Sequence, residues 1–229
     1  MNPKHHIVFF TGAGISKESG LSTFRDANGL WNNYKLDEVA SLKAFETNPE
    51  IVLNFYNERR NQLDTVKPNL AHSLIAQLEK KYKVSVITQN VDDLHERAGS
   101  SNILHLHGEL RKCRSSLDEL LVYDCNEDIK LGDKATDGSQ LRPYVVWFGE
   151  AVSGIEKAIS IVQSADLFII IGTTMMVQPA ASLLLTVPYD VQTVYIDPNP
   201  EVEEGINLLV LKEKATTGMQ LLVDMYLPY

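Results

Sequence analysis

Four short apolar runs recur along the chain, separated by longer segments in which apolar residues follow a helical spacing. Each run is apolar on both faces and ends in a polar or glycine-rich turn, which is typical of parallel strands covered by helices on both sides. The runs are HHIVFF (5–10), KVSVIT (83–88), DLFIIIGT (166–173) and TVYID (193–197), and the helical segments are 48–63, 69–82 and 214–227. This alternation predicts an α/β fold built on an open, Rossmann-like parallel sheet.

The segment from Arg111 to Gln140 interrupts this rhythm. It is polar and rich in aspartate, and Gly132 and Gly138 are natural turn positions within it. A small inserted module and a long surface loop are both compatible with such a segment, although long loops without structure are uncommon inside compact domains. The chain is therefore expected to form one large domain with an insertion.

Composition and charge narrow the class of protein. The chain has 229 residues, 44% of them hydrophobic, and a formal net charge of -9. This composition is that of a globular protein, and the charge argues against direct nucleic-acid binding and against an anionic membrane as partner. The first apolar run is too short for a signal peptide, and none approaches the ~20 residues of a membrane span. We therefore expect a cytoplasmic protein, and the sequence carries no signal for its oligomeric state.

A glycine-rich loop follows the first apolar run. In TGAGISKESG, Gly12 and Gly14 permit close approach of a phosphate to backbone amides, but the third glycine of the usual dinucleotide fingerprint would fall at Lys17. The next residues include Phe24 and Arg25, which suit a ring and a phosphate. The alternative is a plain strand-to-helix turn followed by an ordinary loop.

Two further polar groups follow apolar runs. Gln89, Asn90 and Asp92 stand after the run 83–88, at the end of the strand where open α/β sheets bind ligands. Amides followed by a carboxylate suit a ligand with a carboxamide and hydroxyl groups, although capping of the next helix is the common alternative. Gly172, Thr173 and Thr174 form a second hydroxyl-lined turn after the third run.

The segment HLHGEL contains two histidines. His105 and His107 are two residues apart, so in an extended segment their side chains point the same way. A histidine followed by Gly108 can approach a ligand closely and can serve as a general base, whereas most histidines are structural. We expect only one of the two to act. Further on, RPYVVWFGE (142–150) is predicted as an edge strand that can pair with an extended peptide.

Taken in order, six segments resemble the motifs of the sirtuin family of NAD-dependent protein deacylases. The resemblance runs from Thr11 to the C-terminal helix, and the forms FRDANGLW and RPYVVWFGE are similar to the class III branch, which includes desuccinylating and demalonylating enzymes. The six segments are GAGISKESG, STFRDANGLW, TQNVDDLHERAG, HLHGEL, RPYVVWFGE and GTTMMVQPAA.

The resemblance implies two domains with NAD and acyl-lysine bound between them. The large domain would comprise about 1–30, 66–110 and 150–229, and the small domain about 31–65 and 111–149. His107 and Asn90 match the catalytic positions. The positions matching the cofactor site are Gly12, Ala13, Gly14, Ser16, Phe24, Arg25, Trp31, Gln89, Asn90, Asp92, Gly172, Thr173, Thr174, Asp197, Asn199 and Ala215. The segment YIDPNP departs from the family's usual turn at Asp197 to Asn199.

The substrate side follows from the same resemblance. Acyl-lysine proteins or peptides would bind along Val146, Phe148, Gly149 and Glu150, and His107 would act as base on the ribose hydroxyls while the acyl group moves to ADP-ribose. Tyr56 and Arg59 lie three apart on a predicted helix, so they share a face, and they match the Tyr-x-x-Arg signature of acidic-acyl sirtuins. Arginine suits a carboxylate because its planar fork donates two parallel hydrogen bonds. Succinyl- or malonyl-lysine is therefore the expected substrate, with acetyl-lysine also accepted.

The cysteines depart from the family pattern. Many sirtuins bind a structural zinc with two Cys-x-x-Cys pairs, whereas Cys113 and Cys125 are the only cysteines here and Ser116 stands where a partner of Cys113 would be. Two thiolates without a nearby histidine cannot complete a tetrahedral site, so no zinc is predicted. Packing of five residues is expected to replace it: Leu117, Leu120, Leu121, Val122 and Tyr123.

Two rival functions stay open on the sequence. One is mono-ADP-ribosyl transfer to a protein side chain, and the other is a noncatalytic module that binds NAD or ADP-ribose. The presence of His107 together with Tyr56 and Arg59 favours deacylation over both.

Overall fold

The computed structural model describes residues 5–22, 30–31, 34–174, 178, 180–200 and 202–227, and its main element is a parallel sheet. The six strands lie in the order β11-β10-β9-β1-β4-β5, and each neighbouring pair is parallel. They are β1 (His6–Thr11), β4 (Lys83–Thr88), β5 (Ile103–His105), β9 (Leu167–Ile171), β10 (Gln192–Ile196) and β11 (Leu208–Leu211). The predicted α/β class is confirmed.

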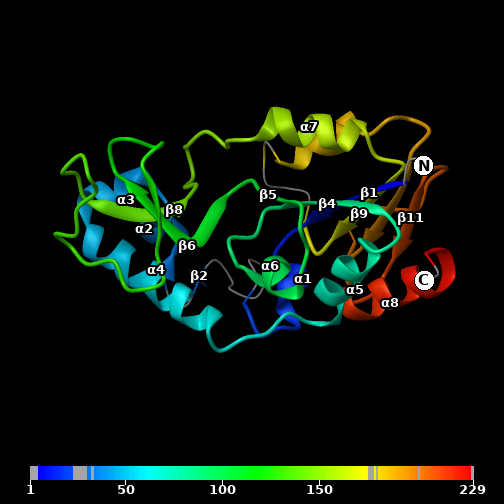
Figure 1. The fold of residues 1–229 in the computed structure, drawn as a ribbon, viewed down its shortest axis with the longest axis horizontal. Helices are drawn as coiled ribbons and strands as arrows, with labels where there is room; N and C mark the ends of the chain where they lie inside the picture. The colour runs from blue at the N-terminus through cyan, green and yellow to red at the C-terminus, as the bar shows by residue number, and fades with distance from the viewer. Residues whose placement is uncertain are drawn as a thin grey trace.

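Helices cover both faces of this sheet (Figure 1). α5 (Leu70–Leu78) and α8 (Ala215–Tyr226) pack on one face, and α7 (Ile155–Gln163) with the 3-10 helix η1 (Ala180–Thr186) packs on the other. Because strand side chains alternate, Ile7 and Phe9 enter the first core, whereas Val8 and Phe10 enter the second. The short helices α1 (Gly14–Lys17) and α6 (Leu94–Ala98) follow β1 and β4.

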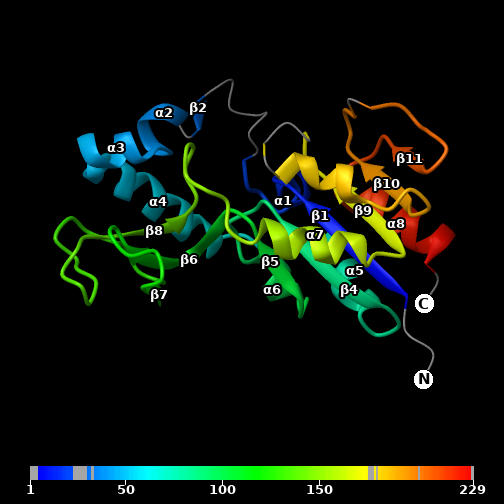
Figure 2. The same cartoon turned by 90° about the horizontal axis from the view of Figure 1, so that it is seen from above.

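A second group of elements lies beside the large sheet (Figure 2). It contains α2 (Leu36–Val39), α3 (Leu42–Thr47), α4 (Pro49–Leu63), a two-stranded ribbon of β2 (Leu30–Trp31) and β3 (Tyr34–Lys35), and an antiparallel sheet in the order β7-β6-β8. The strands of that sheet are β7 (Val122–Asp124), β6 (Gly108–Ser115) and β8 (Leu141–Val145). Its core joins α4 to the sheet, since Val52, Phe55 and Tyr56 pack with Leu110 and Trp147.

The segment 111–140 is structured rather than a free loop. β6 continues to Ser115, and β7 returns antiparallel to it with Cys113 opposite Tyr123. The predicted packing of five residues in place of zinc is wrong for Leu117 and Leu120, because each is 84% exposed, and Val122 is also exposed. The core beside the cysteines consists instead of Leu53, Cys113 and Ile129, with Tyr123 and Cys125 packed against it.

Two strands of the large sheet were not predicted, and one predicted strand is shorter than expected. β5 and β11 have only three and four residues, and β11 is only partly buried along its length. The predicted edge strand 142–150 ends at Val145, because the chain then turns so that Trp147 enters the core and Glu150 meets Arg142. In the part of the chain that the structure describes, no helix combines the length and hydropathy of a membrane span.

Candidate active site

The glycine-rich loop packs against the turn that follows β9. β1 and β9 are neighbours, so their carboxyl ends bring Gly14 onto Gly172, and the Gly14 amide donates to the Gly172 carbonyl at 2.8 Å. A Cβ added to Gly14 would lie 2.5 Å from the Gly172 Cα, and one added to Gly12 would lie 2.7 Å from the Thr173 Cβ. Ala13, between them, has helical backbone angles. The glycines therefore allow two strand ends to touch directly.

A buried polar cluster lies behind this loop. The Asn90 amide nitrogen donates to the Gly12 carbonyl and to the Ser16 hydroxyl, both at 3.2 Å, and the Ser16 hydroxyl donates to the Asp92 carboxylate at 2.9 Å. Burial raises the pKa of Asp92, while hydrogen bonds from the Leu94 amide and Ser16 oppose that shift. Asp92 therefore caps the next helix and also belongs to the polar cluster. One of its oxygens accepts from the Leu94 amide at the start of α6, and the other accepts from the Ser16 hydroxyl.

Gln89 connects this cluster to the Gly172–Thr174 turn. The Thr173 hydroxyl donates to the Gln89 amide oxygen at 2.7 Å, and the Tyr195 hydroxyl donates to the Thr173 carbonyl at 2.8 Å. The Gln89 amide nitrogen is buried and has no hydrogen-bond partner among the described residues. Because an unpartnered buried donor is costly, its position fits a ligand that supplies an acceptor.

The two histidines of HLHGEL have different surroundings. The His107 Nδ1 lies 3.0 Å from the Gln89 carbonyl oxygen. A carbonyl only accepts, so Nδ1 carries the proton and the neutral ring presents Nε2 as a base. Burial lowers the pKa of His107 below its ordinary value, which favours this neutral form, although the bond to Gln89 acts in the opposite direction.

His105 is held at both ring nitrogens. Its Nδ1 lies 2.9 Å from the Asn90 carbonyl oxygen and its Nε2 lies 2.7 Å from a Glu96 carboxylate oxygen. Burial lowers the pKa of His105, but the hydrogen bond and charge of Glu96 outweigh it and the net pKa is raised. Both ring nitrogens of His105 are therefore engaged, whereas among the described residues only Nδ1 of His107 has a hydrogen bond.

Helix α4 presents Tyr56 and Arg59 on the same side. The Tyr56 hydroxyl accepts a hydrogen bond from the Trp147 indole at 3.0 Å, and burial raises the pKa of Tyr56 to about 12. The Arg59 guanidinium carbon lies 5.7 Å from the Phe55 ring centroid. Burial lowers the pKa of Arg59 to about 10, and attraction by Tyr56 and Asp92 opposes this shift. The interaction with Asp92 links α4 to the buried polar cluster.

The segment after β8 runs between the two groups of elements. The Val146 amide donates to the His107 carbonyl, and the Phe148 amide donates to the Ala40 carbonyl, both at 3.0 Å. Phe148 is 54% exposed, and Gly149 has a positive φ of 90°. The Glu150 carboxylate accepts from Arg142, Arg114 and the Trp147 amide. The Glu150 side chain thus holds the segment in place.

The residues predicted for the adenine end lie beside Gly172. The Gly172 amide donates to the Ile196 carbonyl, so the end of β10 brings Asp197 near the loop. Asp197 is buried and accepts from the Asn199 amide at 2.8 Å. Ala215 begins α8, where the Glu18 carboxylate accepts from both the amide and the hydroxyl of Thr216. Phe24 and Arg25 lie outside the described residues, as does the side chain of Trp31.

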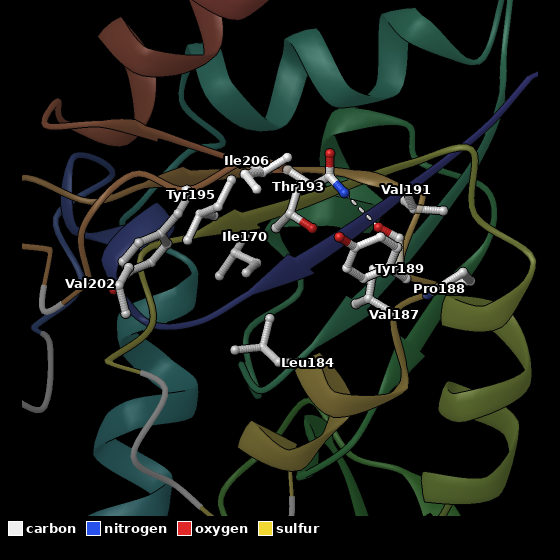
Figure 3. Close-up of a pocket in the computed structure, with 13 residues that line it drawn as sticks. Ile170, Leu184, Val187, Pro188, Tyr189, Val191, Thr193, Tyr195, Val202 and Ile206 are labelled. Atoms are coloured by element: carbon white, nitrogen blue, oxygen red, sulfur yellow. Dashed lines mark hydrogen bonds between the residues drawn. The ribbon is translucent and has the colours of Figure 1, made fainter.

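A separate apolar cavity of about 290 Å³ lies on the sheet face covered by η1 (Figure 3). Ile170, Leu184, Tyr195 and Leu208 line it. It contains none of the residues predicted for the site, so it is distinct from the polar cluster.

Two residues that support the site were not predicted. Trp147 holds the Tyr56 hydroxyl and Tyr195 holds the Thr173 carbonyl. Both residues belong to apolar segments, where the sequence does not distinguish a supporting aromatic residue from an ordinary core residue. The available signal was the polar N–H or O–H group on each ring, because such a group needs a hydrogen-bond partner when it is buried.

Known proteins with similar sequences and folds cover nearly the whole chain. The Sir2 family model matches residues 12–179. An NAD-dependent protein deacylase of Bacteroides thetaiotaomicron is 50% identical over 97% of this chain and 98% of its own length, and one of Helicobacter pylori is 54% identical over 94% of each. A Sir2 homologue solved as an NAD complex superposes with a TM-score of 0.85 at 39% identity, covering 96% of this chain and 89% of its own. This chain therefore belongs to the Sir2 family, the sirtuins.

Proposed function

We propose that the protein is an NAD-dependent protein-lysine deacylase that transfers the acyl group to ADP-ribose and releases nicotinamide. The observation that carries the proposal is the His107 ring, whose Nδ1 is bound by the Gln89 carbonyl while burial favours the neutral form. A group held in this way can take a proton at Nε2 from a hydroxyl. The relatives named NAD-dependent protein deacylase and the NAD-bound homologue support the same activity.

The polar cluster offers a fit for NAD. The unpartnered Gln89 amide nitrogen and the buried Asp92 carboxylate supply a donor and an acceptor next to the Gly12–Gly14 loop. When bound, NAD supplies an electrophilic ribose carbon and nicotinamide as its leaving group. Asn90, fixed by Gly12 and Ser16, orients this end of the site, and the short contact between Gly14 and Gly172 keeps the loop rigid.

For the substrate, we infer that an acyl-lysine peptide lies along Val146, Phe148 and Gly149. Phe148 is exposed and Gly149 has a positive φ, and the amides of Val146 and Phe148 hold this segment against the His107 and Ala40 carbonyls. The Tyr56 and Arg59 pair on α4 then favours an acyl group that ends in a carboxylate. Succinyl- and malonyl-lysine are the proposed substrates beside acetyl-lysine.

The activity is tested by mixing the protein with NAD and a succinyl-peptide and identifying the products by mass spectrometry. Equal amounts of deacylated peptide, nicotinamide and O-succinyl-ADP-ribose are expected, and His107→Ala should abolish all three. Transfer of ADP-ribose onto a protein with no loss of acyl group would establish mono-ADP-ribosyl transfer instead. Binding of NAD without any product would leave a noncatalytic binding module.

The acyl preference is tested by Arg59→Met. The substitution removes the cation but keeps an apolar chain in a buried site, so desuccinylation should fall at least about tenfold relative to deacetylation. The acetyl-peptide rate measured on the same variant is the internal control for folding. An unchanged ratio of the two rates would remove the basis for an acidic-acyl preference.

A further inference from the structure

The end of β4 and the loop after it are held along their backbone by the segment that contains the two histidines. The Thr88 carbonyl accepts from the Leu106 amide at 2.9 Å, and the Val91 carbonyl accepts from the Leu110 amide at 2.8 Å. The two carbonyls between them accept from side chains instead. Because backbone carbonyls at a buried site need donors, the centre of this loop depends on those side chains.

The two donors are the histidines of HLHGEL. The His107 Nδ1 lies 3.0 Å from the Gln89 carbonyl oxygen, and the His105 Nδ1 lies 2.9 Å from the Asn90 carbonyl oxygen. These two carbonyl groups flank the Asn90 Cα, so a rotation of the backbone at Asn90 moves both of them. His105 can therefore act on the site through the backbone that it holds.

The other side of the His105 ring faces a carboxylate. Its Nε2 lies 2.7 Å from a Glu96 oxygen, and the His105 side chain is only 9% exposed. Burial raises the pKa of Glu96, but the hydrogen bond and charge of His105 outweigh it, and the net pKa is lowered, which favours the ionised form. A carbonyl oxygen and an ionised carboxylate both accept and neither donates. Both ring nitrogens must therefore carry a proton, which makes His105 an imidazolium.

The charges around His105 favour this form. Three carboxylates attract the ring, from α6, from β6 and from the loop before α6: Glu96, Glu109 and Asp92. His95 is also within electrostatic range, but burial lowers its pKa well below the ordinary value, so it is neutral. Lys112 lies near Glu96 and pairs with Glu109 at 2.8 Å. Burial alone lowers the pKa of His105, but Glu96 and Glu109 outweigh it and the net pKa is above 6.5.

Loss of one proton from His105 breaks this arrangement. A neutral imidazole has a single N–H group, so it cannot donate to two acceptors. A hydrogen bond to an ionised carboxylate is roughly twice as strong as one to a neutral carbonyl, so the remaining proton stays on Nε2, facing Glu96. The lone pair of Nδ1 then faces the Asn90 carbonyl oxygen, and the two repel each other.

We propose that His105 is a positioning residue for deacylation, which as a cation paired with Glu96 holds the Asn90 carbonyl and releases it on deprotonation. The inference rests on the proposed function, because the backbone that it concerns belongs to Gln89 and Asn90, the residues assigned to NAD. Its consequence is a loss of rate at alkaline pH, separate from the acid limb that His107 sets.

The charge of His105 can be tested without any activity. Side-chain nitrogen NMR of the purified full-length protein follows its titration, and the signals missing in His105→Asn identify it. We expect His105 to titrate above pH 6.5, and Glu96→Gln to lower that value. A His105 that is neutral at pH 6.5, or that titrates identically in Glu96→Gln, would overturn the proposal.

Two substitutions of His105 form a matched pair. His105→Ala removes the donor, whereas His105→Asn puts an amide N–H close to the position of Nδ1 and does not titrate. The kcat/KM for NAD should fall about tenfold in His105→Ala, with the KM for the acyl-peptide unchanged, because the displaced backbone faces NAD. His105→Asn should recover most of this loss. Circular dichroism establishes that both variants are folded, and equal losses in the two would overturn the proposal.

The pH profile separates this role from a merely structural one. In the wild type, kcat/KM for NAD should decline as the pH rises through the pKa of His105. Glu96→Gln should remove this decline, because the new amide donates to Nε2 and leaves the proton of the neutral ring on Nδ1, facing Asn90. An unchanged alkaline limb in Glu96→Gln would overturn the proposal. Absence of deacylation by the wild type at every pH would overturn the proposed function and the positioning role with it, whereas the NMR titration would still decide the charge of His105.

Discussion

At the scale of single residues, the site depends on which histidine nitrogens are already engaged. His105 is bound at both nitrogens and its pKa is raised, whereas His107 is bound only at Nδ1 and its pKa is lowered by burial. The sequence could predict that one of the two would act, because side chains at that spacing share a side. It could not predict which surroundings each would meet, since Glu96 and the Gln89 carbonyl arrive from other elements.

The first prediction concerns the acid limb of activity. A base acts only when neutral, and the pKa of His107 lies below the ordinary 6.5, so the active form persists as pH falls to that value and is lost only below it. The acid limb of kcat/KM for an acyl-peptide should therefore be centred below pH 6.5. Intrinsic fluorescence at each pH separates loss of activity from unfolding. An acid limb centred above 6.5 would contradict the assignment.

The second prediction concerns acid stability. His72 and His95 are buried against each other, with ring centroids 4.8 Å apart, and burial lowers the pKa of His72 to about 4. Because the pKa of His72 is lower in the folded protein than in the unfolded chain, neutral His72 contributes to the free energy of unfolding above pH 6.5. This contribution is lost as the pH falls from 6.5 towards 4. At about 1.4 kcal/mol per pH unit, His72 alone accounts for about 2 kcal/mol of unfolding free energy lost by pH 5.

Urea unfolding near pH 7.5 and pH 5 measures this loss, and His72→Gln, which does not titrate, is the comparison. The difference between the two pH values should shrink in the variant by about the same amount. Equal pH dependence in both proteins would show that His72 titrates in the folded state as it does in the unfolded chain.

At the scale of elements, the site depends on the contact between the loop after β1 and the turn after β9. The apolar runs made these strands predictable, because a continuous apolar run has few alternatives in an α/β fold. The exposure of Leu117 and Leu120 was not predictable, since a cluster of leucines in a polar segment carries no signal for the direction in which it points. Their place in the core is taken by Leu53, which comes from α4, and by Ile129, which follows β7.

The third prediction compares two glycines with positive φ. A Cβ at Gly172 would lie 2.4 Å from the Ile15 amide nitrogen, whereas a Cβ at Gly132, with a φ of 102°, meets nothing within 4 Å. Gly132→Ala should cost about 1 kcal/mol from backbone strain alone. Gly172→Ala should cost several kcal/mol more, because backbone atoms must separate.

Thermal unfolding of the two variants measures the difference, and calorimetric titration with NAD measures binding. We expect Gly172→Ala to lose both stability and NAD affinity, and Gly132→Ala to keep its affinity. Equal losses of stability would mean that the Gly14 and Gly172 backbones are not in close contact.

At the scale of the whole molecule, the small group of elements is held by packing and ion pairs. Glu150, Arg142 and Arg114 form a partly buried network next to the Trp147 core. Among the residues that the structure describes, no three His, Cys, Asp or Glu side chains gather as a metal site requires. The family and fold could be predicted from six motifs in order, whereas the means of holding this region together could not, because it depends on side chains that meet only after folding.

The fourth prediction is that purified protein contains far less than one zinc per chain. Elemental analysis after purification without chelators measures the content, and a Cys113→Ser, Cys125→Ser double variant supplies the background. We expect the two proteins to give the same value. A near-stoichiometric zinc content lost in the double variant would establish that the two thiols bind metal.

The position of β1 at the centre of the sheet also bears on how the chain is made. β1 leaves the ribosome before β4 and β9, yet these are its two neighbours in the sheet, and β9 ends at Ile171. Until β9 has been synthesised, one hydrogen-bonding edge of this entirely buried strand stays unpaired, and unpaired edges favour association with other chains. Helix α8, whose first turn is held by Glu18, emerges later than all six strands of the sheet. Residues 6–11, which are buried along their whole length, therefore lack one of their two neighbouring strands until β9 has been made, and we expect chaperone contact at these residues early in folding.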